Sequence, residues 1–572
     1  MTLHEPRPEA AAPAPSLRRD IPDSHGRNLF DADPDLGRLL GVYLDADTLA
    51  RVRPEFREMG ALAGGPLEDL ALAADRHPPK LHVRTRDGRD EDRIEKHPAY
   101  VELERVAFER FGLAAMSHRA GVFGADAPLH PLVKYGLTFL LVQAEFGLCC
   151  PLSMTDSLTR TLRKFGDPEL VARHAPALTS QSLDTLAQGA MFMTEQIAGS
   201  DVGAVETEAV RDGERWRLTG DKWFCSNPDA ALAMVLARPE GAPPGTRGLS
   251  LFLLPRTLPD GARNRWRVLR LKDKLGTRSM ASGEVRLEGA EAWLVGDPGQ
   301  GFKQMTDMIN MSRLSNGLRA AGLMRRSVNE ALFIAENRSA FGRRLIELPL
   351  MRRQIAKMLV TAEQGRAMCF HTADVLAKAD AGDAGMAKCL RILTPLLKFR
   401  TCRDARKVTG DGMEARGGCG YIEEWSDARA LRDAHLGSIW EGTSNIVALD
   451  VARATRREGA LDALSGHLRA LLAETAEPER GALAGAWDRA AALLAAVAAD
   501  PAREHETRRA ASVVYDAASA AILAWQGARM AAAGEGRRAV AGAVLRHKLT
   551  TRDPLAGEPE EASEIAALIG GD

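Results

Sequence analysis

Hydrophobic periodicity divides the chain into stretches of different structure. From Leu29 to about Ala190, apolar residues recur at three- and four-residue intervals, most clearly in 101–113 and 135–148. This spacing places apolar side chains on one face of an α-helix. Clusters of Gly and Pro, such as ALAGGP at 61–66, interrupt the pattern. The first third of the chain is therefore predicted to be a set of helices joined by short loops.

The pattern changes near Met191 to short apolar or alternating runs, which are typical of strands. Turns rich in Gly, Asp and Pro, such as PEGAPPGTRG at 239–248, separate these runs. We therefore expect a β module in the middle of the chain. Its clearest strands lie at 215–226, 249–256, 266–271 and 283–295.

The helical period returns at Gly301, and after about Arg457 the chain becomes Ala-rich and again helical. Segments near 303–337, 350–380, 384–410 and 445–457 are long enough for a four-helix arrangement. The fold class predicted is mainly α with a central β domain. We expect a flexible N-terminal tip (1–28), an N-terminal helical domain (29–190), a middle β domain (191–300), a helical-bundle domain (301–455) and an additional C-terminal helical domain (456–572).

Composition narrows the class of protein. A chain of 572 residues is too long for one hydrophobic core, and its net charge of -1 provides no general attraction to polyanions. The seven cysteines form no CxxC pair and no zinc-like cluster, so no metal is expected and reduced thiols fit best. The first residues contain no apolar signal region, and no run of about 18 apolar residues could span a membrane. We therefore expect a soluble, cytoplasmic protein.

The first segment that could carry chemistry is MFMTEQIAGSDVG at 191–203, where helix gives way to strand. Thr194 and Ser200 supply hydroxyl groups, and Gly199 lets backbone N–H groups approach a ligand closely. Such a loop can hold a phosphate or the polar edge of a ring. The same residues also suit a simple capped turn.

The second segment is KWFCSN at 222–227, on a predicted strand. Trp223 and Phe224 present flat apolar faces, and Ser226 presents a hydrogen-bonding group beside them. This combination suits a flavin ring, although a half-buried strand has the same pattern.

The third segment, at 415–446, contains paired glycines and the sequence SIWEGTSNI. Glu441 follows apolar Ile439 and Trp440, so it would be partly desolvated, as suits a general base. Alternatively, EGTSN is only a helix start, with Thr443 or Ser444 as the N-cap.

Together these segments resemble the signatures of the acyl-CoA dehydrogenases, in the order of that family. ENRSAFGRRL at 336–345 is similar to the family's Arg-x-x-Phe-Gly motif, and the resemblance covers about 100–455. Sequences at 97–100, 142–155 and 271–285 further resemble the AidB branch, which is named for the adaptive response to DNA alkylation. That branch also has an extra helical C-terminal domain. Glu195-Gln196-Ile197 departs from the commoner Thr-Glu-Pro of the family.

The resemblance implies a family fold with a β-barrel-like middle domain, FAD as cofactor and Glu441 as catalytic base. Arg313 matches a substrate-side arginine. Glu414 stands where the family often has a neutral Gln. The resemblance assigns two groups of residues to FAD. The first group lies around the ring: Met191, Met193, Thr194, Gly199, Ser200, Phe224, Cys225, Ser226, Ile439, Trp440, Gly442, Thr443 and Asn445. The second group lies at the diphosphate or adenosine end of the FAD of a neighbouring subunit: Arg338, Phe341, Glu414, Gly417 and Gly418.

The implied reaction is the α,β-dehydrogenation of an acyl-CoA thioester by a homotetramer, with electron transfer flavoprotein as the oxidant. Two alternatives remain open at this point. A DNA-binding protective flavoprotein is one, although acidic residues balance the basic pairs Arg508-Arg509 and Arg537-Arg538 in the C-terminal region. A flavin oxidase or monooxygenase on the same scaffold is the other.

Overall fold

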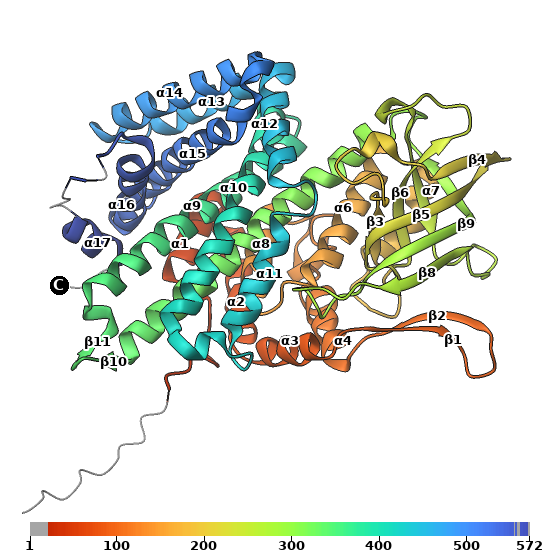
Figure 1. Ribbon diagram of the computed structural model, residues 1–572, viewed down its shortest axis with the longest axis horizontal. Helices are drawn as coiled ribbons and strands as arrows, with labels where there is room; N and C mark the ends of the chain where they lie inside the picture. Colours follow the sequence, from red (N-terminus) through yellow and green to blue (C-terminus); the bar gives the residue numbers. More distant parts are fainter. Residues whose placement is uncertain (1–20, 554, 557–560, 570–572) are drawn as a thin grey trace, which may run out of the picture.

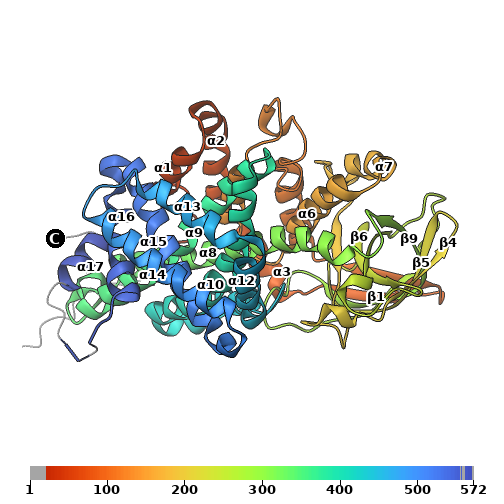
Figure 2. The same ribbon diagram turned by 90° about the horizontal axis from the view of Figure 1, so that it is seen from above.

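Helices occupy most of the molecule, and a β barrel forms one end of it (Figures 1 and 2). The computed structural model describes residues 21–553, 555–556 and 561–569. The predicted fold, mainly helical with a central β domain and further helices after the bundle, is confirmed. Most of the tip expected at 1–28 lies outside the described residues. Within its last part, Ser24 is buried and donates a hydrogen bond to Glu330 (2.6 Å).

The N-terminal helices differ from the predicted ones in one place. The helix expected over 135–148 ends at Leu141, because the Glu145 carboxylate accepts a hydrogen bond from the backbone N–H of Leu148 (3.1 Å) and shapes a turn there. A Cβ on Gly147 would lie 2.7 Å from both Glu145 and Ser279, so the turn requires glycine. The helices are α1 (Pro34–Tyr43), α2 (Ala46–Ala63), α3 (Pro66–Arg76), α4 (Pro98–Glu104), α5 (Pro131–Leu141), α6 (Cys149–Phe165) and α7 (Pro168–Leu178).

An antiparallel hairpin, β1 (Lys80–Arg84) and β2 (Asp90–Glu95), interrupts these helices and reaches towards the barrel (Figure 1). Its mostly exposed, charged residues give no hydrophobic alternation, and the sequence analysis missed it for that reason. The Asp87-Gly88 pair, with Gly88 at φ +87°, is the turn signal that could have revealed it.

The middle strands form a closed sheet, because β7 pairs with both β9 and β6. Large apolar side chains such as Phe192, Trp266 and Phe252 fill its interior. The expected barrel-like domain is therefore confirmed. The strands are β3 (Gly189–Phe192), β4 (Glu208–Asp212), β5 (Arg215–Ser226), β6 (Leu232–Pro239), β7 (Ser250–Pro255), β8 (Trp266–Leu271) and β9 (Ser282–Val295).

Two buried carboxylates fix the barrel to the helices. Asp433 accepts a hydrogen bond from the backbone N–H of Thr277 (2.6 Å), and Glu145 accepts one from the Ser279 hydroxyl (2.7 Å). Burial raises the pKa of Asp433 to about 7, and nearby Glu145 raises it as well. The loop between β8 and β9 is thus anchored on the helical side, which sets the position of the barrel relative to the bundle.

Long helices form the bundle behind the barrel, at the predicted positions. They approach closely where α8 carries glycine: a Cβ on Gly317 would lie 2.1 Å from Leu397, and one on Gly322 would lie 2.9 Å from the Phe139 carbonyl. The elements are α8 (Gly301–Asn337), α9 (Pro349–Asp380), α10 (Ala384–Arg416), α11 (Ser426–Gly437) and α12 (Ser444–Glu458), with a small hairpin of β10 (Ser339–Ala340) and β11 (Arg343–Arg344) after α8.

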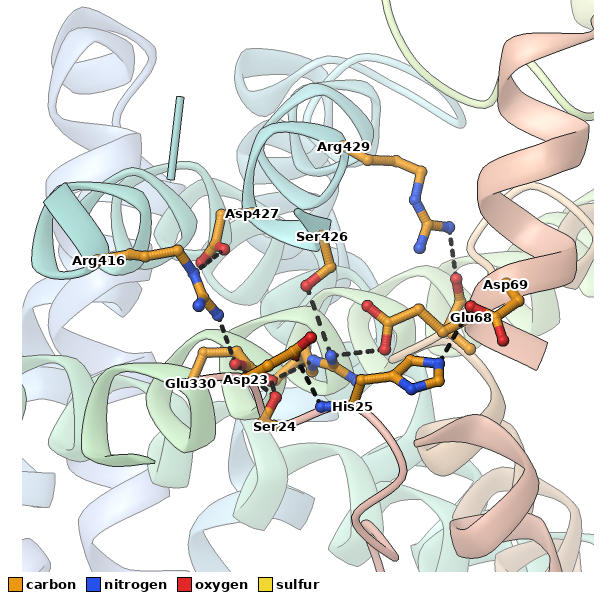
Figure 3. Close-up of polar contacts among 12 residues, drawn as sticks. Asp23, Ser24, His25, Glu68, Asp69, Glu330, Arg416, Ser426, Asp427 and Arg429 are labelled. Carbon is orange, nitrogen blue, oxygen red and sulfur yellow. Dashed lines mark hydrogen bonds and ion pairs between the residues drawn. The ribbon is translucent and has the colours of Figure 1, made fainter. Parts of the chain in front are cut away.

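A buried ion network ties the start of the described chain to the far end of the bundle (Figure 3). Arg416, the last residue of α10, pairs with Glu330 of α8 (2.5 Å) and Asp427 of α11 (2.6 Å). Ser24 donates to the same glutamate, and Arg326 extends the network to α3. Breaking such a buried pair typically costs about 3–5 kcal/mol. The network therefore fixes the backbone just before Gly417.

The last helices pack against α9, α10 and α12 of the bundle, with α15 at their centre (Figure 1). Within the described part of the chain, one helix, α14, is long and apolar enough to cross a membrane by length and composition alone. It packs on α15 with Trp487 fully buried. The helices are α13 (Ala460–Leu472), α14 (Glu479–Ala499), α15 (Thr507–Arg529), α16 (Glu535–Val544) and α17 (Glu561–Ile569).

Polar side chains connect these helices to the rest of the protein. His371 of α9 and His467 of α13 share a hydrogen bond between their Nε2 atoms (2.8 Å), and Tyr43 contacts the other ring nitrogen of His371 (3.3 Å). Gln526 of α15 donates to the Tyr43 hydroxyl (2.6 Å) and accepts from Arg537 (3.0 Å). Burial lowers the pKa of His371 well below 6.5 and lowers that of His467 as well.

This histidine pair predicts acid sensitivity. Lys378 also disfavours the protonated form of both rings, whereas Asp374 and Asp383 favour it at His467. The unfolded chain binds protons near pH 6.5 and the folded pair does not, so the free energy of unfolding should fall as pH drops below 6.5. The slope should be at most about 1.4 kcal/mol per pH unit for each histidine. Urea unfolding between pH 7.5 and 5 measures it.

The double variant His371→Gln/His467→Gln should lose this slope between pH 6.5 and 5. Asp433, whose pKa burial raises to about 7, titrates in the same window with the opposite sign, but it contributes equally to wild type and variant, so the difference between their slopes isolates the histidine pair. An equal slope in wild type and variant would contradict the prediction.

Candidate active site

Glu441 lies in a tight turn between α11 and α12. Its φ is +51° and that of Gly442 is +100°, so both residues adopt left-handed backbone that non-glycine residues rarely take. The buried Lys398 side chain donates to the Gly442 carbonyl, and Arg313 Nε donates to the Glu441 carbonyl (3.2 Å). Arg313 is held in turn by Asp450 (2.6 Å). Helices α8, α10 and α12 thus fix the backbone of one carboxylate residue from three sides.

The two oxygens of the Glu441 carboxylate differ. Oε1 accepts a hydrogen bond from the Ser312 hydroxyl (2.5 Å), while Oε2 is buried and has no hydrogen-bond partner among the described residues. Glu441 and Gly442 line a cavity of about 1070 Å³ together with Met193, Gly199 and Ser200. A carboxylate with one oxygen held and the other free can accept a proton from a ligand in that cavity.

Lys398 was missed by the sequence analysis. Its side chain is buried within the apolar run TPLLKF of α10, and burial lowers its pKa to about 8, while Cys402 and Glu441 raise it. An isolated lysine in an apolar helix face is the signal that could have drawn attention to it. Lys398 stabilises the turn by donating a hydrogen bond to the Gly442 carbonyl.

The loop at 193–203 takes its shape from Glu195. This buried carboxylate accepts hydrogen bonds from the Thr207 hydroxyl (2.5 Å), the backbone N–H of Glu206 (2.7 Å) and Lys222 (2.7 Å). Burial alone would raise the pKa of Glu195, but Lys222 and the hydrogen bonds lower it. Glu195 therefore anchors the loop to β5, while Gly199 and Ser200 stay exposed at the cavity.

The two segments expected to face a flavin ring, the loop at 193–203 and strand β5, are joined by a backbone hydrogen bond. The backbone N–H of Trp223 donates to the Thr194 carbonyl (2.9 Å), so β5 runs beside the loop that follows β3. Phe224 is 61% exposed and Ile439 is 59% exposed, which is unusual for large apolar side chains. The Cys225 side chain points the other way, into the barrel core.

The remaining residues predicted near the ring lie around the same turn. Ser226 is half-buried and forms a hydrogen bond with the Cys150 thiol. This bond lowers the pKa of the thiol, but burial raises that pKa to about 11. Met191 is half-buried against the large core. Trp440 stacks on Phe146 with ring centroids 6.0 Å apart. Thr443 precedes α12 as its N-cap residue, and Asn445 in its first turn accepts a hydrogen bond from Arg508 of the C-terminal helices (3.4 Å).

A second group of predicted residues lies far from Glu441. Arg338 and Phe341 follow the C-terminal end of α8, about 37 Å along its axis from Arg313. Arg338 Nη1 donates to the Arg416 carbonyl (3.1 Å) beside Gly417, and Phe341 is 92% exposed. Gly418 and Glu414 are exposed at the same end. Within one chain these residues therefore cannot meet the same cofactor as Glu441.

The first group fits a planar ring with attached phosphates. Phe224 and Ile439 supply exposed apolar faces, and Ser200 supplies a hydroxyl at the cavity. A Cβ on Gly199 or Gly418 would meet no atom within 4 Å, so a ligand can approach the backbone at both positions. No group of three or more side chains suited to a metal ion occurs in the described residues.

Comparisons with known proteins agree with this architecture. Family models match in chain order: the adaptive response protein AidB N-terminal domain at residues 20–185, the acyl-CoA dehydrogenase middle domain at 190–290 and the acyl-CoA dehydrogenase C-terminal domain at 299–455. Each match falls on the corresponding helical or barrel region.

Whole proteins show the same likeness. The chain is 35% identical to AidB of Escherichia coli (strain K12) over 74% of this chain and 77% of that protein. It is 32% identical to acyl-CoA dehydrogenase family member 11 of Caenorhabditis elegans over 78% of this chain and 74% of that protein. The structure of Caenorhabditis elegans ACDH-11 in complex with C11-CoA covers 95% of each chain with a TM-score of 0.86 and 28% identity. The chain therefore belongs to the acyl-CoA dehydrogenase family, in the branch that includes AidB.

Proposed function

We propose that this protein is an FAD-dependent dehydrogenase that removes hydrogen from the α and β carbons of an acyl-CoA thioester. The observation that carries the proposal is Glu441 itself, which lines the cavity together with the 193–203 loop and whose Oε2 has no hydrogen-bond partner among the described residues. A structurally similar relative was crystallised with an acyl-CoA, which supports the same substrate class here.

In this reaction Glu441 accepts the α-proton on Oε2 while Ser312 holds Oε1 in place. Lys398 and Arg313 keep the turn from moving as charge shifts onto the substrate. The backbone N–H of Glu441 would stabilise the developing charge on the thioester oxygen, as the resemblance implies. A positioned donor of this kind is worth about 3–4 kcal/mol. When bound, FAD supplies the acceptor for the β-hydride.

The chain's own residues would hold FAD in two places. The 191–200 loop, Phe224, Ser226 and the 439–445 turn would hold the ring and adjoining atoms. Arg338, Phe341, Gly417 and Gly418 would hold the adenosine end of a neighbouring subunit's cofactor, because they lie about 37 Å from Arg313 along α8. We therefore propose a homo-oligomer, with the tetramer as its form and electron transfer flavoprotein as oxidant.

The observations do not favour a DNA-binding function. Of the basic residues that suggested it, Arg537 is buried on Glu363 and Gln526, Arg509 pairs with Glu506 (2.5 Å), and Lys548 donates to Gln364 (2.6 Å). Arginine and lysine side chains already paired within the protein release few counterions on a phosphate backbone. The dehydrogenase therefore remains the proposed function.

The base assignment predicts a specific loss in Glu441→Gln. The amide keeps the size of the side chain and can still accept from Ser312, so FAD should bind at wild-type stoichiometry. It cannot accept the α-proton, so anaerobic bleaching of the flavin by an acyl-CoA should slow by at least about 10³-fold. Stopped-flow absorbance at the flavin band measures the rate. Bleaching at the wild-type rate would reject Glu441 as the base.

The shared cofactor predicts a second effect, at the exposed ring of Phe341. Replacing it by Ala should lower the ratio of FAD to protein several-fold and weaken association between subunits, because the side chain has no burying contacts within its own chain. Absorbance at purification gives the ratio, and light scattering gives the mass. Val83→Ala, at another exposed apolar residue, is the control. Full FAD occupancy in a Phe341→Ala monomer would contradict the shared site.

A further inference from the structure

A row of buried polar side chains runs inward from Glu441 along α8. Ser312, Asn316 and Arg319 are spaced by four and three residues, so they lie on one face of the helix. Asn316 and Arg319 are 0% exposed. Both side-chain atoms of Asn316, and both Nη atoms of Arg319, have no hydrogen-bond partner among the described residues. Buried polar groups are rarely left unpaired, so this row marks a place where a ligand supplies the partners.

Arg319 is held in position by aromatic rings and not by an acid. Its guanidinium lies beside the stacked pair of rings, 4.8 Å from the ring centroid of Trp440 and 5.3 Å from that of Phe146. Its Nε donates a hydrogen bond to the Ser315 carbonyl (3.3 Å). The arrangement orients the two Nη atoms and leaves their N–H groups available.

The positive charge of Arg319 has no counterion in the described residues. The carboxylate of Glu441 accepts a hydrogen bond from Ser312, and Asp450 pairs with Arg313 and Arg391. The nearby groups are thiols: burial raises the pKa of Cys149 to about 12, that of Cys150 to about 11 and that of Cys402 to about 12, so all three are neutral. A buried cation without an anionic partner is strongly unfavourable unless a ligand brings the charge.

We propose that the acyl group of the substrate ends in a carboxylate that binds the two Nη atoms of Arg319, with Asn316 as a second donor. This assignment rests on the proposed dehydrogenase function. A guanidinium binds a carboxylate through two parallel hydrogen bonds, which the free Nη atoms of Arg319 can form. The substrate class is therefore a CoA thioester of a dicarboxylic acid.

The spacing along α8 limits the length of that acid. Ser312, which holds Glu441, lies seven residues before Arg319, or about 10 Å along the helix axis. The α carbon must lie at Glu441, and the carboxylate must lie at Arg319. A short acyl chain spans this separation.

The test compares, on FAD-loaded protein under anaerobic conditions, two thioesters whose acyl chains have equal length in non-hydrogen atoms. Glutaryl-CoA ends in a carboxylate and hexanoyl-CoA ends in a methyl group. Wild type should bind glutaryl-CoA at least tenfold more tightly, judged from the perturbation of the flavin spectrum. Arg319→Leu should lose that preference, and Arg319→Lys should keep part of it because the cation remains without the bidentate geometry.

A matched control is available in the C-terminal helices. Arg529 also lies over a tryptophan, with its guanidinium 5.7 Å from the Trp525 ring centroid, but it is exposed and pairs with Glu474. Arg529→Leu should leave the preference for glutaryl-CoA unchanged. The ratio of FAD to protein and the circular dichroism of each variant show whether the fold survives.

Equal binding of the two thioesters by wild type would overturn the inference, as would an undiminished preference in Arg319→Leu. Should Arg319→Leu fail to fold, Asn316→Val and Arg319→Lys decide, and an unchanged preference in both would overturn it. These results leave the dehydrogenase proposal standing if either thioester bleaches the flavin. If neither thioester binds FAD-loaded wild type, the substrate assignment fails, and anaerobic bleaching of the flavin by a longer monocarboxylic acyl-CoA decides separately whether the proposed function stands.

Discussion

The left-handed turn at Glu441 and Gly442 is the constraint on which the site depends. A glutamate at φ +51° is held there only because other groups bond its neighbouring carbonyls. Lys398 and Arg313 do so from α10 and α8, and Asp450 of α12 fixes Arg313 in turn. The long helices are rigid through close packing at Gly317. The helices of the bundle therefore hold the strained turn in place, and they fix the position of the Glu441 carboxylate.

The same rigidity extends to the opposite end of the bundle. Arg416 ends α10 in a buried ion network (Figure 3). Its carbonyl accepts a hydrogen bond from Arg338 beside Gly417. The exposed Phe341 is carried on the hairpin that follows α8. If both groups of residues hold FAD, as proposed, their separation of about 37 Å on the same helices means that a site would be completed only by pairing with another copy. On that proposal, cofactor binding and assembly would be one process.

Much of this could be predicted from the sequence, because helical and strand periodicity are local. The long helices from Gly301 onward and the strands at 215–226 and 283–295 were found at nearly their true bounds. The hairpin at 80–95 was missed because its charged residues show no alternation, and the end of α5 was missed because Gly147 acts through a distant Ser279. Motif resemblance pointed to Glu441. Only the packing of separate helices could reveal Lys398 and Asp450 as its supports.

The arginines of α8 show most clearly what sequence alone leaves undetermined. Arg313 was assigned to the substrate because it matches a family position, yet its guanidinium is occupied by Asp450 and the Glu441 carbonyl. Arg319 matched no motif, and its Nη atoms are the ones left without partners. Both residues are buried cations, so burial does not separate them. What separates their roles is the presence of a counterion: a paired arginine holds structure, whereas a desolvated and unpaired one is stable only with a ligand. On the proposal made above, substrate choice would be set about two helical turns beyond Ser312, which holds the Glu441 carboxylate.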